Sequence, residues 1–205
     1  MKAILLIEDR FQRQKVFFNN YEDLNEIEGL YNSIDNKENQ ALVSQLTTID
    51  ECNRLLRGYH LIILHRSYID NSKINTVEKY AKNNNKDLIL FSGGIDQSSY
   101  SKEDESQILL INSKDFYSDN LIPFLKGYIS GDVNNLLYLL YGDNWRLPYL
   151  LRYRQLLVNQ KNGDIIGEDI DEEEFDTIKE VINYKDKDIG IEKINDEVNS
   201  IIKFL

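Results

Sequence analysis

The chain has little cysteine, a deficit of basic charge and no long apolar run. Its single cysteine, Cys52, excludes a disulfide framework within the chain and a zinc site made of cysteines. The 24 Lys and Arg residues are outnumbered by 35 Asp and Glu residues, which disfavours double-stranded nucleic acid as a partner, because phosphates need a basic protein surface. No apolar run is long enough for a membrane span or a signal peptide, so we expect a soluble, cytoplasmic protein.

Short apolar runs alternate with helix-like segments in the first two thirds of the chain. Buried strands are predicted at residues 3–7, 41–46, 61–64, 87–91 and 108–111. Strands that alternate with helices indicate a parallel sheet with right-handed crossovers. We therefore expect an α/β fold in which residues 1–130 form a five-stranded, parallel, flavodoxin-like sheet with its helices. Residues 131–205 no longer alternate and are predicted to form an α-helical extension.

Polar side chains follow several of the predicted strands. Glu8 and Asp9 come after the first strand, His65 after the third, Ser92 after the fourth and Lys114 shortly after the fifth. The carboxyl ends of parallel strands meet at one edge of an open α/β sheet, where such sheets bind ligands. We therefore expect these five side chains to lie close together.

This layout resembles the receiver domain of bacterial response regulators over roughly residues 1–127. The resemblance implies that Glu8 and Asp9 match the acidic pair that holds magnesium, and that Ser92 and Lys114 match the residues that bind the phosphoryl group. His65 stands where the family has its phosphorylated aspartate, and an imidazole supplies neither that nucleophile nor a hard oxygen ligand for magnesium. We therefore predict a pseudo-receiver, a non-catalytic regulatory or adaptor protein in signalling that cannot be phosphorylated on aspartate in the usual way.

Two arrangements of His65 are open. An imidazole with the two carboxylates of Glu8 and Asp9 is a known ligand set for a transition metal. Alternatively, the ring hydrogen-bonds to these acids, whose charges would raise its pKa and make it responsive to pH. We favour the hydrogen-bonded arrangement and expect neither a metal nor a cofactor.

The motif Ser92-Gly93-Gly94-Ile95-Asp96 competes with this interpretation. It resembles the SGGxDS loop of PP-loop ATP pyrophosphatases, in which glycines let backbone amides cradle pyrophosphate. The resemblance implies a nucleotide-binding enzyme or sensor whose phosphate loop contains Ser92, Gly93, Gly94 and Asp96. Such a loop should open a long helix that faces the phosphates, whereas the segment that follows is short and charged. We favour a glycine turn that needs a positive φ or a close approach.

The helical extension carries a cluster of arginines interleaved with aromatic residues. This composition is typical of an interface hot spot, so we expect a protein partner or a second copy of the chain to dock there. Internal pairing with the acids at residues 168–174 is an open alternative, and single-stranded nucleic acid is less favoured. Apolar residues three and four apart in residues 191–205 predict a heptad seam that must pack on this chain or on a second one. The candidate partner-binding residues are Trp145, Arg146, Tyr149, Arg152, Tyr153 and Arg154.

Overall fold

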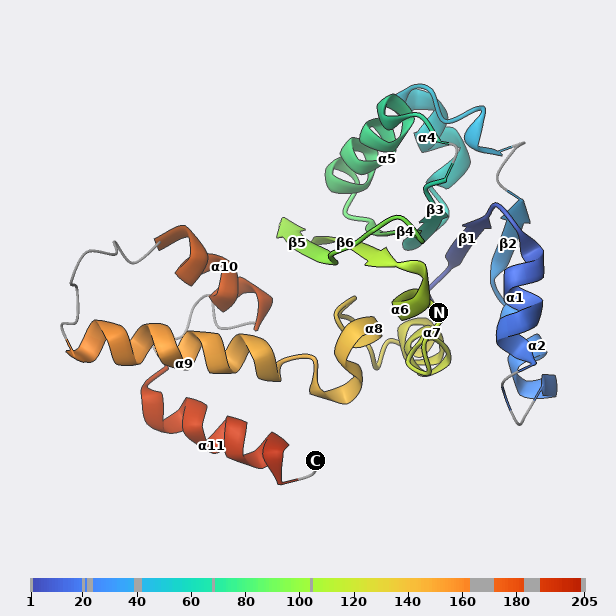
Figure 1. The fold of residues 1–205 in the computed structure, drawn as a ribbon. Coiled ribbons are helices and arrows are strands. Elements are labelled where there is room, and N and C mark those ends of the chain that lie inside the picture. The colour runs from blue at the N-terminus through green and yellow to red at the C-terminus, as the bar shows by residue number, and fades with distance from the viewer. Residues whose placement is uncertain are drawn as a thin grey trace. The chain divides into compact units, whose positions relative to one another are not determined.

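A six-stranded, mostly parallel sheet is the centre of the first part of the chain in the computed structural model (Figure 1). Five strands run parallel in the order β2-β1-β3-β4-β6, and β5 pairs antiparallel with β6 at one edge. This arrangement confirms the predicted α/β class and a predominantly parallel sheet. The strands are β1 (Ile4–Glu8), β2 (Asp35–Glu38), β3 (Leu61–His65), β4 (Asp87–Ser92), β5 (Ser99–Glu103) and β6 (Ser106–Asn112).

The chain divides into two compact units, residues Met1–Gly142 and Asp143–Leu205. The sequence predicts the boundary earlier, after residue 130. The first unit extends further because Leu136 and Leu139 are buried in its core. The structure describes residues 2–19, 21, 24–38, 42–67, 69–103, 105–162, 172–182 and 189–203.

Helices cover both faces of the sheet, because its central strands are apolar on both sides. Alternate residues of a strand enter different cores: Ile4 and Leu6 of β1 lie in the first core, and Leu5 and Ile7 lie in the second. The first core contains residues of α1 (Phe11–Phe18), α2 (Leu24–Asn32), α6 (Ser113–Phe116), α7 (Leu121–Ser130) and α8 (Tyr138–Tyr141), and the second contains residues of α4 (Ile49–Leu56) and α5 (Asn71–Asn83).

The predicted strand at residues 41–46 is wrong within the described residues 42–46, which begin as helix and continue as a turn. Val43 and Leu46 are buried against the sheet from this turn, which accounts for the apolar sequence. The strand beside β1 is β2 instead. Its sequence Asp-Asn-Lys-Glu is polar because β2 lies at the edge of the sheet and pairs only with β1.

The sheet has six strands rather than the predicted five, because β5 forms an antiparallel hairpin with β6. Tyr100 pairs with Leu109, and Ser101 pairs with Ile108. The side chains of β5 are alternately exposed and half-buried, which is the pattern of a strand with one covered face. This strand was not predicted from the sequence because its residues are polar and charged and do not form an apolar run.

The described part of the second unit contains three helices, with α9 in contact with both of the others. Ile194 and Val198 of the predicted heptad seam are buried in its core, so the seam packs on helices of its own unit. Leu205, the last residue of that seam, lies outside the described residues. Pro148 lies in the first turn of α9, where proline is tolerated. The helices are α9 (Leu147–Asn162), α10 (Glu172–Val181) and α11 (Ile191–Ile202), preceded by a 3-10 turn at Gly142–Asn144.

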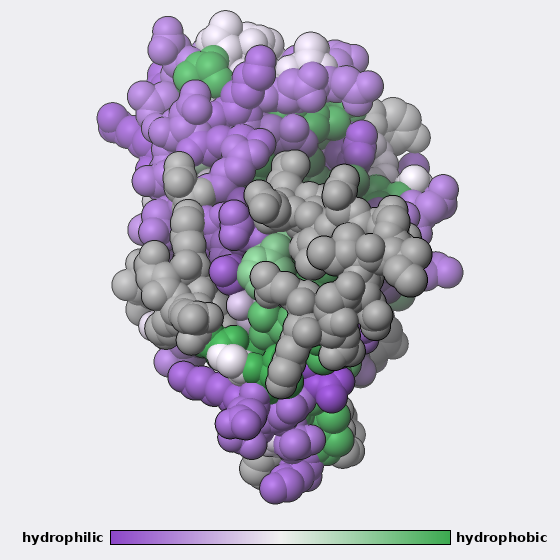
Figure 2. Space-filling model, turned by 90° about the vertical axis from the view of Figure 1, so that its left-hand side faces the viewer, coloured by the Kyte–Doolittle hydropathy of each residue, from purple (hydrophilic) through white to green (hydrophobic). Residues whose placement is uncertain are grey.

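Among the coloured side chains in Figure 2, hydrophilic ones cover more of the visible surface than hydrophobic ones. This agrees with a composition in which 29% of the residues are charged. Among the residues that the structure describes, none of the helices combines the length and the apolar character needed to cross a bilayer.

Candidate functional site

Glu8 and His65 lie side by side at the carboxyl ends of two neighbouring strands. The register of β1 and β3 pairs Ile7 with Leu64, which brings the next residue of each strand together. Because side chains alternate along a strand, both point to the face that carries the first core. Both side chains are 0% exposed. Asp9 follows β1 directly, so the predicted proximity of Glu8, Asp9 and His65 is seen in the structure.

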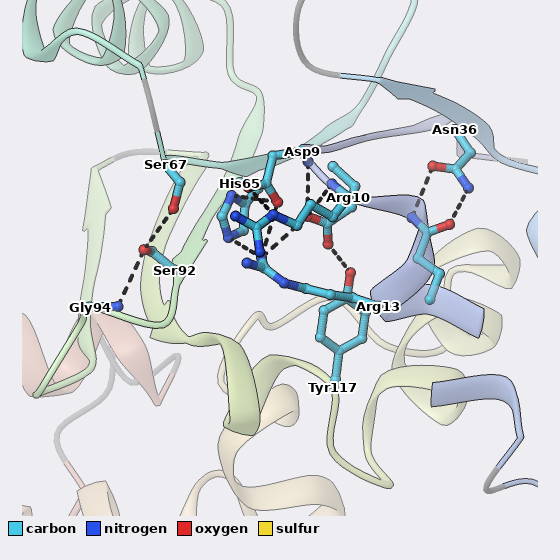
Figure 3. Close-up of polar contacts among 11 residues, drawn as sticks. Asp9, Arg10, Arg13, Asn36, His65, Ser67, Ser92, Gly94 and Tyr117 are labelled. Atoms are coloured by element: carbon cyan, nitrogen blue, oxygen red, sulfur yellow. Dashed lines mark hydrogen bonds and ion pairs between the residues drawn. The ribbon is translucent and has the colours of Figure 1, made fainter. Parts of the chain in front are cut away.

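Arg13 extends from the first turns of α1 into this group of acids and imidazole (Figure 3). Its Nη1 lies 2.6 Å from His65 Nε2, 3.0 Å from Asp9 Oδ1 and 3.5 Å from Glu8 Oε1. A guanidinium nitrogen can only donate, so Nε2 of His65 accepts the hydrogen bond and its proton resides on Nδ1. We call Glu8, Asp9, Arg13 and His65 the strand-end cluster.

Glu8 is held from three sides although it is fully buried. The backbone N–H groups of Asp9 and Arg10 donate to its Oε1 at 2.8 and 3.3 Å. The hydroxyl of Tyr117, which follows α6, donates to its Oε2 (Figure 3). The pKa of Glu8 is raised to about 7, chiefly by burial and next by the hydrogen bond with Asp9, against the opposing effect of the Tyr117 hydroxyl.

The pKa values of Asp9 and His65 are both lowered, which favours a charged carboxylate and a neutral imidazole. Burial raises the pKa of Asp9, but the bond with Glu8 and the charges of His65 and Arg13 together lower it below its ordinary value. Burial lowers the pKa of His65 to about 4, and Arg13 contributes in the same direction, whereas Asp9 opposes both. The expected rise in the pKa of His65 is therefore wrong: burial and the guanidinium outweigh the carboxylates.

Aromatic rings form the wall behind His65 and account for its burial. Phe91, its register partner on β4, meets the imidazole edge-on with ring centroids 4.9 Å apart. Phe91 in turn stacks on Phe116 at 4.1 Å and meets the ring of Tyr117 edge-on at 5.8 Å. Low polarity on this side strengthens electrostatic interactions in the cluster.

The hydrogen bonds of Ser92 and Lys114 go to residues outside the strand-end cluster. Ser92 Oγ lies 3.4 Å from Ser67 Oγ and accepts from the backbone N–H of Gly94 at 3.4 Å (Figure 3). Lys114 is exposed, and its backbone N–H donates to Asn112 Oδ1 as part of the cap of α6. Among the described residues, the Lys114 ammonium makes no hydrogen bond or ion pair with the cluster. Arg13 is the cation that lies there instead.

The loop at Gly93 and Gly94 has neither the features of a phosphate loop nor those of a turn that requires glycine. The segment that follows it forms β5, whereas the PP-loop resemblance requires a long helix. Asp96, the acid of that motif, lies in a bend before β5. The structure also gives the two glycines no positive φ, and a β-carbon on either would meet nothing within 4 Å. The structure therefore does not require glycine at these positions.

Arginines of the second unit pair within that unit. Arg152 binds Glu174 through two hydrogen bonds, at 2.7 and 2.8 Å. Arg146 forms an ion pair with Glu197, and Arg154 donates to an amide side chain of α11. Glu174 belongs to the acidic segment that the sequence offered as an internal partner.

The aromatic members of that candidate interface are at least partly covered. Tyr153 is 2% exposed and belongs to the core of the second unit. Trp145 and Tyr149 are half-buried. Large apolar side chains that do face solvent on these helices are Leu151, 44% exposed, and Ile202, 50% exposed.

Sequence reasoning missed Arg13 and Tyr117. Arg13 could have been found, because it lies four residues after Asp9 at the start of a helix, the spacing of an ion pair. Tyr117 gave no such signal, because its contact with Glu8 depends on the position of α6 in the fold.

Comparisons of the chain with protein-family models, curated proteins and solved structures give no match.

Proposed function

We propose that this chain is a cytoplasmic, non-catalytic regulatory or adaptor protein whose first unit is a receiver-like domain unable to accept a phosphoryl group. In this proposal the protein acts by binding another protein or a second copy of itself. The observation that carries the proposal is the imidazole of His65 at the end of β3, where the receiver resemblance implies a carboxylate, in contact with Arg13.

The strand order supports the receiver-like part of the proposal. The parallel strands β2-β1-β3-β4-β6 follow the order 2-1-3-4-5 of flavodoxin-like sheets, with the β5 hairpin added at one edge. In such sheets ligands and reacting groups lie at the carboxyl ends of the strands, where Glu8, Asp9 and His65 gather. This grouping of Glu8 and Asp9 with His65 supports the receiver-like part of the proposal.

The contacts of the cluster support the loss of phosphorylation. A receiver needs a carboxylate nucleophile, an oxygen-bound magnesium ion and a nearby lysine. At the nucleophile position His65 is fully buried, and its Nε2 is occupied by Arg13. The Arg13 guanidinium already neutralises Asp9, and in the described part of the chain the Lys114 ammonium makes no hydrogen bond or ion pair with the cluster. These arrangements favour a domain held in one state.

Treatment with acetyl phosphate and Mg²⁺ tests this part of the proposal. We expect the intact mass of the protein to stay unchanged under conditions in which a functional receiver domain gains one phosphoryl group. A phosphoryl group mapped to Glu8, Asp9 or another carboxylate would overturn the proposal.

The second unit supplies the candidate binding surface, because Leu151 and Ile202 face solvent on its helices. If the partner is a second copy, sedimentation velocity should show association that rises with protein concentration. Leu151→Asp should weaken that association. Val16→Asp, at a side chain of the first unit that is 66% exposed, is the matched control and should leave it unchanged. Equal effects of the two substitutions would argue against the second unit as the interface.

A further inference from the structure

His65 has bonding capacity that the protein does not use. The residue is 0% exposed, and its Nδ1 has no hydrogen-bond partner among the described residues. Asp9 Oδ1 lies 3.3 Å from this nitrogen, but Arg13 donates to the same oxygen at 3.0 Å. A buried polar nitrogen without a partner is costly, so Nδ1 marks a place where a further group would be stabilised.

The spacing of the side chains fits a metal ion. Two ligands of a tetrahedral ion with bonds of about 2.1 Å lie roughly 3.4 Å apart. The 3.3 Å between His65 Nδ1 and Asp9 Oδ1 matches that separation. Glu8 offers a third ligand, because one ligand atom from each of the three residues lies within 4.8 Å of the others.

The ligand types select the kind of ion. Magnesium and calcium prefer a shell made only of oxygen atoms. Imidazole with carboxylates suits first-row transition metals such as Zn²⁺, Co²⁺ and Mn²⁺. We propose that Glu8, Asp9 and His65 bind a divalent transition-metal ion through His65 Nδ1, and that Arg13 competes with this ion for the cluster. This inference goes beyond the proposed function and does not depend on the receiver resemblance.

Arg13 opposes the metal in two ways. Its hydrogen bond to Nε2 keeps the imidazole proton on Nδ1, where the metal must bind. Its positive charge also lies 3.0 Å from Asp9 Oδ1 and repels a second cation. The Arg13 side chain is 34% exposed, so it can turn outward into solvent. When it leaves, the proton can move to Nε2 and Nδ1 becomes a ligand.

A pair of arginine substitutions separates this mechanism from a general charge effect. Arg13→Met removes the competing guanidinium. Arg10→Met is the matched control, because Arg10 lies 3.8 Å from Asp9 Oδ2, is 58% exposed and is not hydrogen-bonded to His65 in the described structure. Both substitutions are made in a His60→Gln background, which removes the other histidine of the chain. Binding is measured by calorimetry with Zn²⁺ and by the visible absorption of Co²⁺.

We expect one Zn²⁺ per chain. Arg13→Met should bind it at least about tenfold more tightly than the His60→Gln protein that keeps both arginines, because a group beside a metal ligand changes metal affinity by about 10–100-fold. Arg10→Met should bind Zn²⁺ with the same affinity as the His60→Gln protein that keeps both arginines. His65→Gln and, separately, Asp9→Asn should abolish saturable binding and the Co²⁺ bands in the Arg13→Met protein.

The proposal is overturned if Arg13→Met binds no metal, binds it no more tightly than Arg10→Met, or keeps its binding after both ligand substitutions. Asp9→Asn decides the matter if His65→Gln fails to fold, as judged by circular dichroism. Failure here leaves the acetyl phosphate test untouched, because that test requires no transition metal.

Discussion

Arg13 Nη1 and His65 Nε2 lie 2.6 Å apart, so a helix residue and a strand residue 52 positions away hold each other in place. The bond orients the imidazole, fixes its tautomer and draws the start of α1 against the end of β3. It also brings a positive charge to two acids, one of which is fully buried. The behaviour of the cluster should therefore depend on all four of its members.

The pKa shifts of Glu8 and His65 predict opposing pH dependences of stability in metal-free protein. The pKa of Glu8 is raised to about 7, so its contribution to stability is lost as pH rises from about 4.5 to 7. The pKa of His65 is lowered to about 4, so its contribution is lost as pH falls from 6.5 to about 4. At pH 5.5 the pair binds one proton in both the folded and the unfolded state, and the two slopes cancel.

Single substitutions should reveal each slope. Relative to wild type, Glu8→Gln should lose stability as pH falls from about 7 to 4.5, and His65→Gln should lose it as pH rises from about 4 to 6.5. Urea unfolding in EDTA at several pH values measures the differences. Difference curves that stay flat for both variants would contradict the assigned shifts.

Tyr117→Phe should destabilise the first unit by roughly 1–3 kcal/mol, because it leaves a buried oxygen of Glu8 without its donor. Tyr59→Phe removes a hydroxyl that bonds to the exposed Asp35, where water replaces it, so its effect should stay within about 0.5 kcal/mol. Chemical denaturation of both variants measures the contrast. Equal losses of stability would contradict this prediction, because they would mean that the Tyr117 hydroxyl contributes no more than an exposed one.

Gly131→Ala should cost about 1–2 kcal/mol, because Gly131 ends α7 with a φ of 93°, where a β-carbon is strained. Gly93→Ala should change stability by less than about 0.5 kcal/mol, since its β-carbon meets nothing and its φ is not positive. Thermal unfolding compares the two. A large loss of stability in Gly93→Ala would indicate that this loop does require glycine.

Cys52 should react with a thiol reagent only after unfolding. It is 0% exposed in α4, and burial raises the pKa of its thiol to about 11, which leaves little thiolate at neutral pH. Labelling with a chromogenic disulfide should therefore be slow in buffer and complete in urea. Rapid native labelling would show that α4 opens readily.

The sequence predicts the centre of the sheet better than its edges. The apolar runs of β1, β3 and β4 are buried on both faces, so their sequence is sufficient to identify them. The polar edge strands β2 and β5 carry no such signal. At the start of α4, Thr48 Oγ1 accepts a hydrogen bond from the backbone N–H of Glu51 at 3.2 Å, the N-cap contact that serine and threonine favour.

The same distinction applies to the strand-end cluster. Its strand residues could be predicted because parallel strands bring their carboxyl ends together. The pKa of His65 could not, because its direction depends on the burial by Phe91 and on the contact with Arg13, which only the folded chain brings about.

The two polar edge strands also bear on how the protein behaves at high concentration. An exposed sheet edge is a template on which a further strand can add, and apolar edges lead to aggregation. Here Asp35 and Lys37 stand on one edge and Lys102 and Glu103 on the other. Charged side chains at both ends of the sheet disfavour its growth from one molecule into the next, so the apolar central strands stay enclosed within a single chain.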